Sequence, residues 1–149
     1  MPIKKQLYDQ LLQQVNQRVS NAQKAMQAAE DSKNNETKSS AGDKFETSRA
    51  MMQGEEERNK IQLAKALALR QQLAQIDISK IGAKIVVGSL VYTTQGNYFL
   101  TVGLGKIIVD GITYFAISLA SPIGQLLFGK MEKEAVNFRG KDIKIKRIE

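Results

Sequence analysis

The composition of the chain changes abruptly near Asp77, and this change limits the folds that are possible. Residues 1–76 are rich in Gln, Ala, Lys and Glu, and Gly occurs there only at positions 42 and 54. Residues 78–149 hold nine of the eleven glycines and most of the Ile, Val, Phe and Tyr. The first composition is typical of helices and the second of strands. We therefore predict an α+β protein in two parts, residues 1–77 and residues 78–149.

Apolar residues recur in the first part at alternating spacings of four and three, the pattern of a coiled coil. In the first helix they are Tyr8, Leu12, Val15, Val19, Ala22, Met26 and Ala29. In the second, expected from Asp43 to about Ile76, the positions are Phe45, Met52, Asn59, Leu63, Ala66, Leu69 or Arg70, Leu73 and Ile76. The polar segment 34–42 predicts a loop. We therefore expect an antiparallel two-helix hairpin with its tip at about residues 34–46, each helix being about 45 Å long.

Two carboxylates, Asp43 and Glu46, stand at the tip of this hairpin. Their spacing is that of a capping box, and both acids suit the positive end of a helix dipole. Carboxylates are also the ligands that Mg²⁺ prefers. The residues alone leave both roles open, and the two roles are compatible.

The chain contains no Cys and no His. This excludes thiolate nucleophiles and Cys-ligated metals, and it removes the commonest general base. Catalysis would have to use carboxylates, lysines, hydroxyls or a hard ion such as Mg²⁺. The N-terminal residues lead into a polar helix without an apolar signal region, and turn residues interrupt the long apolar runs. We expect no membrane segment and a cytoplasmic location.

The second part alternates strand-like runs with turn signals. We predict a small antiparallel sheet with strands over 84–93, 97–104, 113–119, 135–138 and 143–148, and turns at 95–97 and 110–111. Ser121, Pro122 and Gly129 are the N-cap, the first position and the stop of one short helix. Gly103-x-Gly105-Lys106 indicates a strand end or bulge rather than a phosphate loop, because no helix start follows it. Core residues are expected among Ile85, Val86, Val87, Leu90 and Val91.

The C-terminal segment is basic, in a chain of formal net charge +7. Its cations are Lys130, Lys133, Arg139, Lys141, Lys144, Lys146 and Arg147, against Glu132, Glu134 and Asp142. Such a patch can guide RNA or an acidic protein surface. Exposed aromatic residues are not interleaved with it in the sequence, so the pattern favours a solvated surface over a stand-alone nucleic-acid site. The aromatic residues between 92 and 115 are expected in the core and on the sheet faces.

Two segments of the chain resemble the Gre family of bacterial transcription elongation factors. Gly42-Asp43-x-x-Glu46 is similar to the Gly-Asp-x-x-Glu at the tip of that family's coiled coil. The segment Ser121-Pro122-Ile123-Gly124, with Leu127 and Gly129-Lys130, looks like the family's Ser-Pro-aliphatic-Gly/Ala…Leu-x-Gly-Lys. The resemblance implies an N-terminal antiparallel coiled coil followed by an FKBP-like sheet domain.

The resemblance also implies a function at RNA polymerase. Gre factors dock at the rim of the secondary channel, and the coiled coil enters toward the active centre. Docking would then involve Ser121, Pro122, Ile123, Gly124, Leu127, Gly129 and Lys130. Asp43 and Glu46 would help to retain a second Mg²⁺ with which the polymerase hydrolyses backtracked RNA. The chain would act as a monomer without a tightly bound cofactor or a catalytic activity of its own, and its basic surface would face the 3′ end of the nascent RNA.

The tip departs from the family pattern, which continues Glu-Asn-x-Glu-Tyr. Here Glu46 is followed by Thr47-Ser48-Arg49-Ala50, so Arg49 stands where a second acid would be. Several functions therefore stay open. The chain is either a factor that stimulates transcript cleavage or a Gre-like regulator that docks without cleavage. The alternatives are an FKBP-like prolyl isomerase or chaperone, and a dimeric coiled-coil adaptor.

Overall fold

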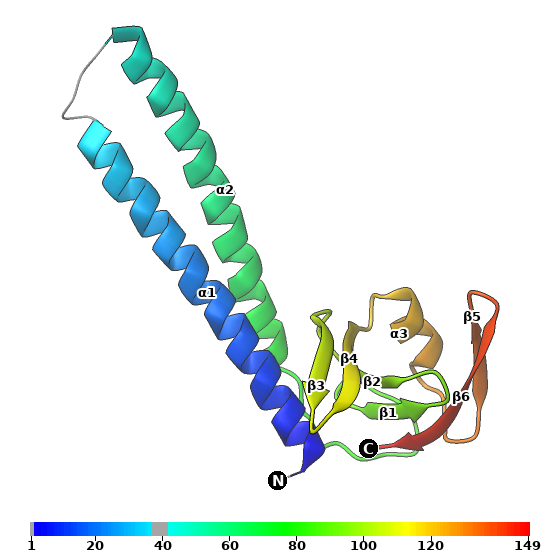
Figure 1. The fold of residues 1–149 in the computed structure, drawn as a ribbon. Helices are drawn as coiled ribbons and strands as arrows, with labels where there is room; N and C mark the ends of the chain where they lie inside the picture. Colours follow the sequence, from blue (N-terminus) through cyan, green and yellow to red (C-terminus); the bar gives the residue numbers. More distant parts are fainter. Residues whose placement is uncertain (1, 37–41) are drawn as a thin grey trace. The chain divides into compact units, whose positions relative to one another are not determined.

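The computed structural model describes the backbone of residues 2–36 and 42–149, and the side chains at 33, 35, 36 and 42–48 lie outside the described part. The chain divides into two compact units. We call Gln13–Gln71 the arm, and Met1–Leu12 together with Gln72–Glu149 the sheet unit. Two long helices are followed by a sheet with one short helix (Figure 1), which confirms the predicted α+β class. In the described part, no helix has the length and apolar character needed to cross a membrane.

The arm consists of most of helix α1 (Ile3–Glu36) and most of helix α2 (Gly42–Ala74). Of the two alternatives in the seam predicted for α2, Leu69 is half-buried and Arg70 is exposed, so Leu69 is the seam residue. The other described members within α2 are also buried or half-buried: Met52, Asn59, Leu63, Ala66 and Leu73. The Asn59 side-chain amide donates to the Ala25 carbonyl of α1 at 3.3 Å, so the polar seam residue contacts the facing helix. The predicted loop starts too early, because α1 continues through Glu36. The remaining loop residues 37–41 lie outside the described residues.

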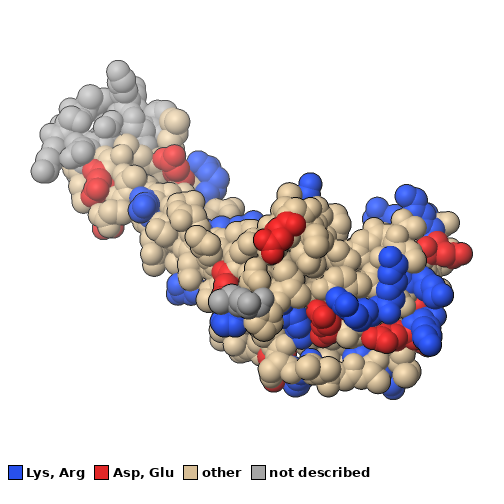
Figure 2. All heavy atoms as spheres, turned by 60° about the horizontal axis from the view of Figure 1, so that its bottom comes forward, with Lys and Arg blue, Asp and Glu red and all other residues tan. Residues whose placement is uncertain are grey.

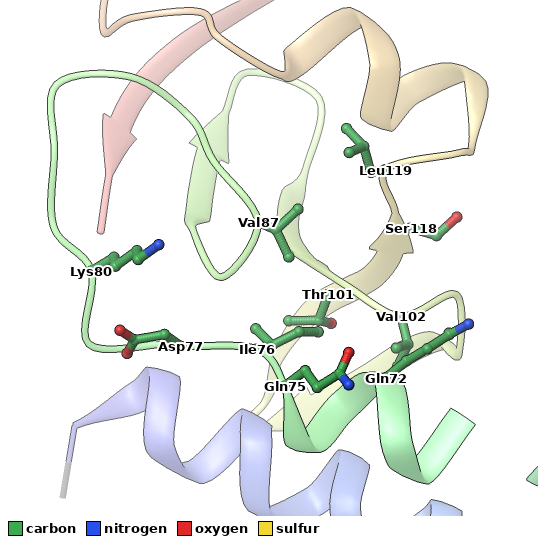
Figure 3. Close-up of a pocket in the computed structure, with 10 residues that line it drawn as sticks. All are labelled: Gln72, Gln75, Ile76, Asp77, Lys80, Val87, Thr101, Val102, Ser118 and Leu119. Atoms are coloured by element: carbon green, nitrogen blue, oxygen red, sulfur yellow. The ribbon is translucent and has the colours of Figure 1, made fainter. Parts of the chain in front are cut away.

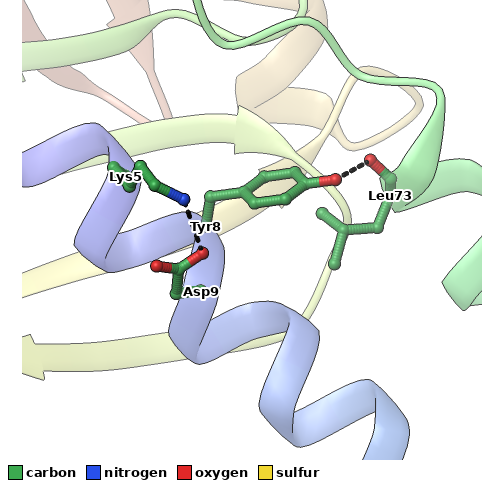
Figure 4. Close-up of polar contacts among 4 residues, drawn as sticks. All are labelled: Lys5, Tyr8, Asp9 and Leu73. Carbon is green, nitrogen blue, oxygen red and sulfur yellow. Dashed lines mark hydrogen bonds and ion pairs between the residues drawn. The ribbon is translucent and has the colours of Figure 1, made fainter.

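The first turns of α1 bury a different stripe from the predicted one. Leu7 and Leu11 are completely buried, whereas Tyr8 and Leu12 are half-buried. The hydroxyl of Tyr8 donates to the Leu73 carbonyl at 2.9 Å (Figure 4). This carbonyl belongs to the last turn of α2, where C=O groups lack the helical partner four residues on. Tyr8 thus ties the start of α1 to the end of α2 within the sheet unit, while the nearby exposed Lys5–Asp9 ion pair contributes little.

The sheet has six strands in the order β3-β4-β2-β1-β6-β5. The strands are β1 (Leu90–Thr93), β2 (Asn97–Thr101), β3 (Gly105–Val109), β4 (Ile112–Ser118), β5 (Ala135–Phe138) and β6 (Lys141–Ile148). The sheet is mostly antiparallel, as predicted, and one pair departs from the prediction, because β2 and β4 are parallel. The strand β3, which we did not predict, forms an edge, and β4 returns between β3 and β2. The return is the predicted Asp110-Gly111 turn, whose φ angles of 52° and 76° suit a two-residue hairpin.

The main core cluster includes one face of the sheet and helix α3 (Pro122–Leu127), which packs against β4 and β5. Its buried members are Ile85, Val91, Leu100, Ile123, Leu127, Val136, Ile143 and Ile145. The predicted strand over 84–93 shortens to β1, since the chain turns at Gly88. Only glycine fits there, because φ is +100° and a Cβ would lie 2.5 Å from the Asp77 carbonyl oxygen.

Candidate functional site

Helix α3 contains the Ser-Pro-Ile-Gly segment, and this sequence determines its local structure. The Ser121 hydroxyl accepts from the Gly124 N–H at 3.0 Å and donates to the Ser118 carbonyl at 2.6 Å. Pro122 is the first helical residue, and Gly129 follows the C-cap with a φ of 79°. Gly124 is required because a Cβ would lie 2.1 Å from the Ser118 carbonyl oxygen. The predicted start and stop of this helix are confirmed.

The seven residues predicted to dock on a polymerase divide between core and surface. Ile123, Gly124 and Leu127 are buried, and the two apolar side chains belong to the core cluster. The other four are exposed or half-buried: Ser121, Pro122, Gly129 and Lys130. The buried group can shape the surface of α3, and only the second group is accessible to a partner.

Large apolar side chains are exposed at both ends of α3. Leu119 precedes the helix and is 38% exposed, whereas Phe128 (45%) and Met131 (43%) follow it. Lys130 stands between the last two in the sequence. Exposed apolar side chains that lie together can mark sites of interaction. We call Leu119, Phe128 and Met131, which flank α3 in the sequence, the α3 patch. The sequence pattern does not reveal them, because no periodicity distinguishes these residues from core residues.

The two tip acids lie at the start of α2, which begins at Gly42 rather than at Asp43. The side chains of Asp43 and Glu46 are outside the described residues, so their capping and metal-binding roles stay predictions. Arg49 is described, and it is exposed on the same helix. Among the described side chains, no three His, Cys, Asp or Glu residues are grouped so that they could hold a metal ion.

A pocket of about 420 Å³ opens in the sheet unit where the end of α2 meets the sheet (Figure 3). It is lined by Gln72, Gln75, Ile76, Asp77, Lys80, Val87, Thr101, Val102, Ser118 and Leu119. Hydrogen bonds from the hydroxyl and the N–H of Ser79 lower the pKa of Asp77. A carboxyl group held ionised in this way is a poor proton donor. Asp77 is therefore not suited to act as a general acid in this pocket.

Lys and Arg side chains gather over the end of the sheet unit where β5 and β6 lie (Figure 2). Their acidic neighbours are engaged in local hydrogen bonds: Glu132 accepts from the Ile148 N–H, Glu134 from the Met131 N–H and Asp142 from the Asn137 amide. Arg147 pairs with Glu149 at 3.3 Å. The other cations of the patch, which form no ion pair with any described residue, are Lys130, Lys133, Arg139, Lys141, Lys144 and Lys146. Their charge is available to an anionic partner.

Comparison with known proteins does not assign the chain to a family. No family model matches it, and no curated protein does. A solved structure, described as that of the transcription factor Gfh1, is similar over 95% of this chain and 92% of that chain, with 16% identity and a TM-score of 0.35. Values this low do not establish a shared function.

Proposed function

We propose that the chain is a Gre-like transcription factor that binds RNA polymerase at the secondary channel and acts on paused or backtracked complexes. The observation that supports this most is the order of its parts. A hairpin of two long helices precedes an α+β unit in which Ser121, Pro122 and Gly124 build α3. This order is what the resemblance of the tip and of the α3 segment implies. Residues 78–149 would dock and residues 1–77 would reach into the channel of a cytoplasmic polymerase.

Docking is assigned to the surface around α3. The α3 patch offers apolar contact, and Lys130 adds a positive charge that suits an acidic surface. Ile123 and Leu127 lie beneath this surface and hold the helix on the sheet. The tip acids Asp43 and Glu46 would then act at the polymerase's own Mg²⁺ site, as ligands and without a reaction centre in this chain.

Pull-down of purified RNA polymerase tests the docking surface. The double variant Phe128→Ser/Met131→Ser should reduce capture about tenfold, because truncation of central apolar contacts typically weakens binding by more than ~1 kcal/mol. Ile108→Ser is the matched control, since Ile108 is 55% exposed on the edge strand β3. Capture should be unchanged in the control. Full capture by the double variant, with circular dichroism showing all variants folded, would refute docking through α3.

A regulator that docks without cleavage is the second candidate, and Arg49 favours it. Its charge lies three residues after Glu46 on α2, where it opposes the retention of Mg²⁺. A stalled elongation complex separates the two versions. A cleaving factor shortens the transcript, and Asp43→Ala/Glu46→Ala abolishes the shortening, whereas the regulator binds without shortening. Arg49→Glu should then increase cleavage, and absence of polymerase binding by the unaltered chain would overturn both versions.

The isomerase alternative has weaker support. An isomerase cleft needs aromatic walls and few polar groups. The pocket that comes closest contains Tyr98 and Phe138, but Gln95, Arg139 and Lys141 make up half of its lining. A proline-peptide isomerisation assay distinguishes this function, and activity at the level of an isomerase would overturn the transcription proposal.

A further inference from the structure

Three half-buried aromatic residues lie on the sheet face that also carries the core cluster. Tyr98 on β2 and Phe115 on β4 are register partners, and their ring centroids are 6.0 Å apart with the planes inclined by 33°. Phe138 ends β5 and, like Tyr98, packs at the margin of the cluster. The sequence does not bring these rings together, since they come from three separate strands. The sheet places them on one face.

A pocket of about 280 Å³ lies beside Tyr98 on this face. Its lining consists of Gln95, Tyr98, Phe138, Arg139, Lys141 and Ile143. Small-molecule pockets usually begin at about 300 Å³. This pocket is therefore suited to one planar ring, with Tyr98, Phe138 and Ile143 giving apolar contact and Gln95 giving an amide.

Two cations flank the pocket at the tip of the β5–β6 hairpin. The Arg139 guanidinium carbon lies 4.9 Å from the centre of the Phe138 ring, and Lys141 is the register partner of Phe138. Arg139 has a φ of 54°, in a turn position that usually takes Asn, Asp or Gly. Neither cation forms an ion pair with a described residue.

A third cation, Lys106, lies on the same face at the other edge of the sheet. Lys106 on the edge strand β3 is exposed and is the register partner of Phe115, so it belongs to the same face. In the strand order of the sheet, Lys106 on β3 is followed by the rings of Phe115 on β4 and Tyr98 on β2. Lys141 on β6 and Phe138 on β5 come after them, beside the pocket. Proteins that bind single-stranded nucleic acid combine stacking rings with cations along the backbone in this way.

We propose that this face binds single-stranded nucleic acid, with one base in the pocket of Tyr98 and Phe138 and the adjoining phosphates on Arg139 and Lys141. An acidic peptide would use the two cations, but it would leave the rings and the Gln95 amide without a matching partner. The inference does not depend on a polymerase, and its test uses the full chain alone.

Fluorescence anisotropy with a labelled single-stranded oligouridylate tests the two cations. Arg139→Asn with Lys141→Gln should weaken binding at least tenfold and should lower the salt slope by about 1.4, because each phosphate contact on a single strand contributes about 0.7. Asn suits the left-handed φ at position 139, so the turn is preserved. Lys144→Gln is the control, because it removes one positive charge from the opposite face of β6. The control should change affinity by less than about threefold.

Phe138→Leu tests the base in the pocket. It keeps the apolar bulk at the edge of the core but removes the stacking ring, and affinity should fall at least fivefold. Quenching of tyrosine fluorescence by the oligonucleotide should also decrease. Three results would overturn the proposal: no binding by the unaltered chain at low salt, an equal loss in Lys144→Gln, or unchanged affinity in Phe138→Leu. Displacement of the oligonucleotide by oligoglutamate at equal concentration would show that the face is an acidic-peptide site instead.

Discussion

The arm and the sheet unit are stabilised in different ways. The sheet unit almost completely buries large side chains such as Phe99, Leu100 and Leu127. Among the described residues of the arm, the buried ones are small, namely Val15, Val19, Ala22 and Ala66. A groove of about 480 Å³ in the arm is lined in part by Ala25 and Asn59. Because burial stabilises in proportion to apolar area, the sheet unit can depend on its core, whereas the arm depends more on helix propensity and local pairs.

Two spectroscopic signals separate these units. All four tyrosines, Tyr8, Tyr92, Tyr98 and Tyr114, belong to the sheet unit, and the chain has no Trp. Tyrosine fluorescence therefore reports the sheet unit, and helical circular dichroism reports mainly the arm. A variant that destabilises one unit should shift the unfolding midpoint seen by the signal of that unit and leave the midpoint seen by the other signal unchanged.

The largest effect is expected from Leu127→Ala. Leu127 is 1% exposed in the core cluster, so truncation leaves a cavity that costs about 2–5 kcal/mol of unfolding free energy. Val19→Ala is the matched change in the arm, where the loss should be about 1 kcal/mol or less because Ala favours the helix. Urea unfolding followed by both signals measures each. If both signals shift together in either variant, the two units unfold as one and the comparison fails.

The next effect concerns Gly124 in the sheet unit. Gly124→Ala should lower the stability of the sheet unit by about 2–3 kcal/mol, because the added Cβ would meet the Ser118 carbonyl oxygen at 2.1 Å and displace α3. The tyrosine signal in urea should show the loss. Because α3 would carry the docking surface, polymerase capture should fall as well. An unchanged midpoint would mean that the close approach of α3 to Ser118 is not required.

What the sequence allowed us to predict followed from local signals. The start and stop of α3 depend on Ser121, Pro122 and Gly129, which flank one short helix, and the Asp110-Gly111 turn depends on two residues. The α2 seam follows from a repeat within one helix. Such features could be predicted because each depends on residues within a few turns of one another.

What we could not predict depends on pairing between distant strands. The edge strand β3 has only five residues, and its first is a glycine, which weakened the strand signal. The parallel contact of β2 with β4 follows from the order of strands in the sheet, which no local pattern gives. The aromatic face has the same cause, since Tyr98, Phe115 and Phe138 become neighbours only after the strands have paired. The α3 patch requires knowledge of which side of a short helix faces the core.

A smaller effect, of opposite sign, is expected in the arm. Gly54 lies inside α2, and a Cβ there would meet only the end of the flexible Arg58 side chain, at 3.6 Å. Gly54→Ala should therefore stabilise the arm by about 1 kcal/mol, the difference in helix propensity between the two residues. Thermal unfolding followed by helical circular dichroism should show a higher midpoint, with the tyrosine signal unchanged. A lower midpoint would indicate that the absence of a side chain at Gly54 is needed for the packing of α2.

The last effect is a dependence of sheet-unit stability on alkaline pH. Burial raises the pKa of Tyr92 to about 12, and its hydroxyl donates to the Glu149 carboxylate at 3.2 Å. Below pH 10 the phenol is protonated in both the folded and the unfolded chain. As the pH rises from 10 to 12 the unfolded chain loses this proton first, so the folded state loses stability over that interval.

Tyr92→Phe removes this dependence and provides its test. The unfolding free energies of the unaltered chain and the variant should converge as the pH rises from 10 to 12, because only the former loses the contribution of this phenol. Lysines titrate in both proteins and cancel in the difference, as does Tyr98, whose pKa burial also raises. Phenolate absorbance of the folded chain should include a titration near pH 12 that Tyr92→Phe removes. Curves that stay parallel across this interval would mean that Tyr92 titrates alike in both states, so that the packing around β1 does not shield the Tyr92 hydroxyl from solvent.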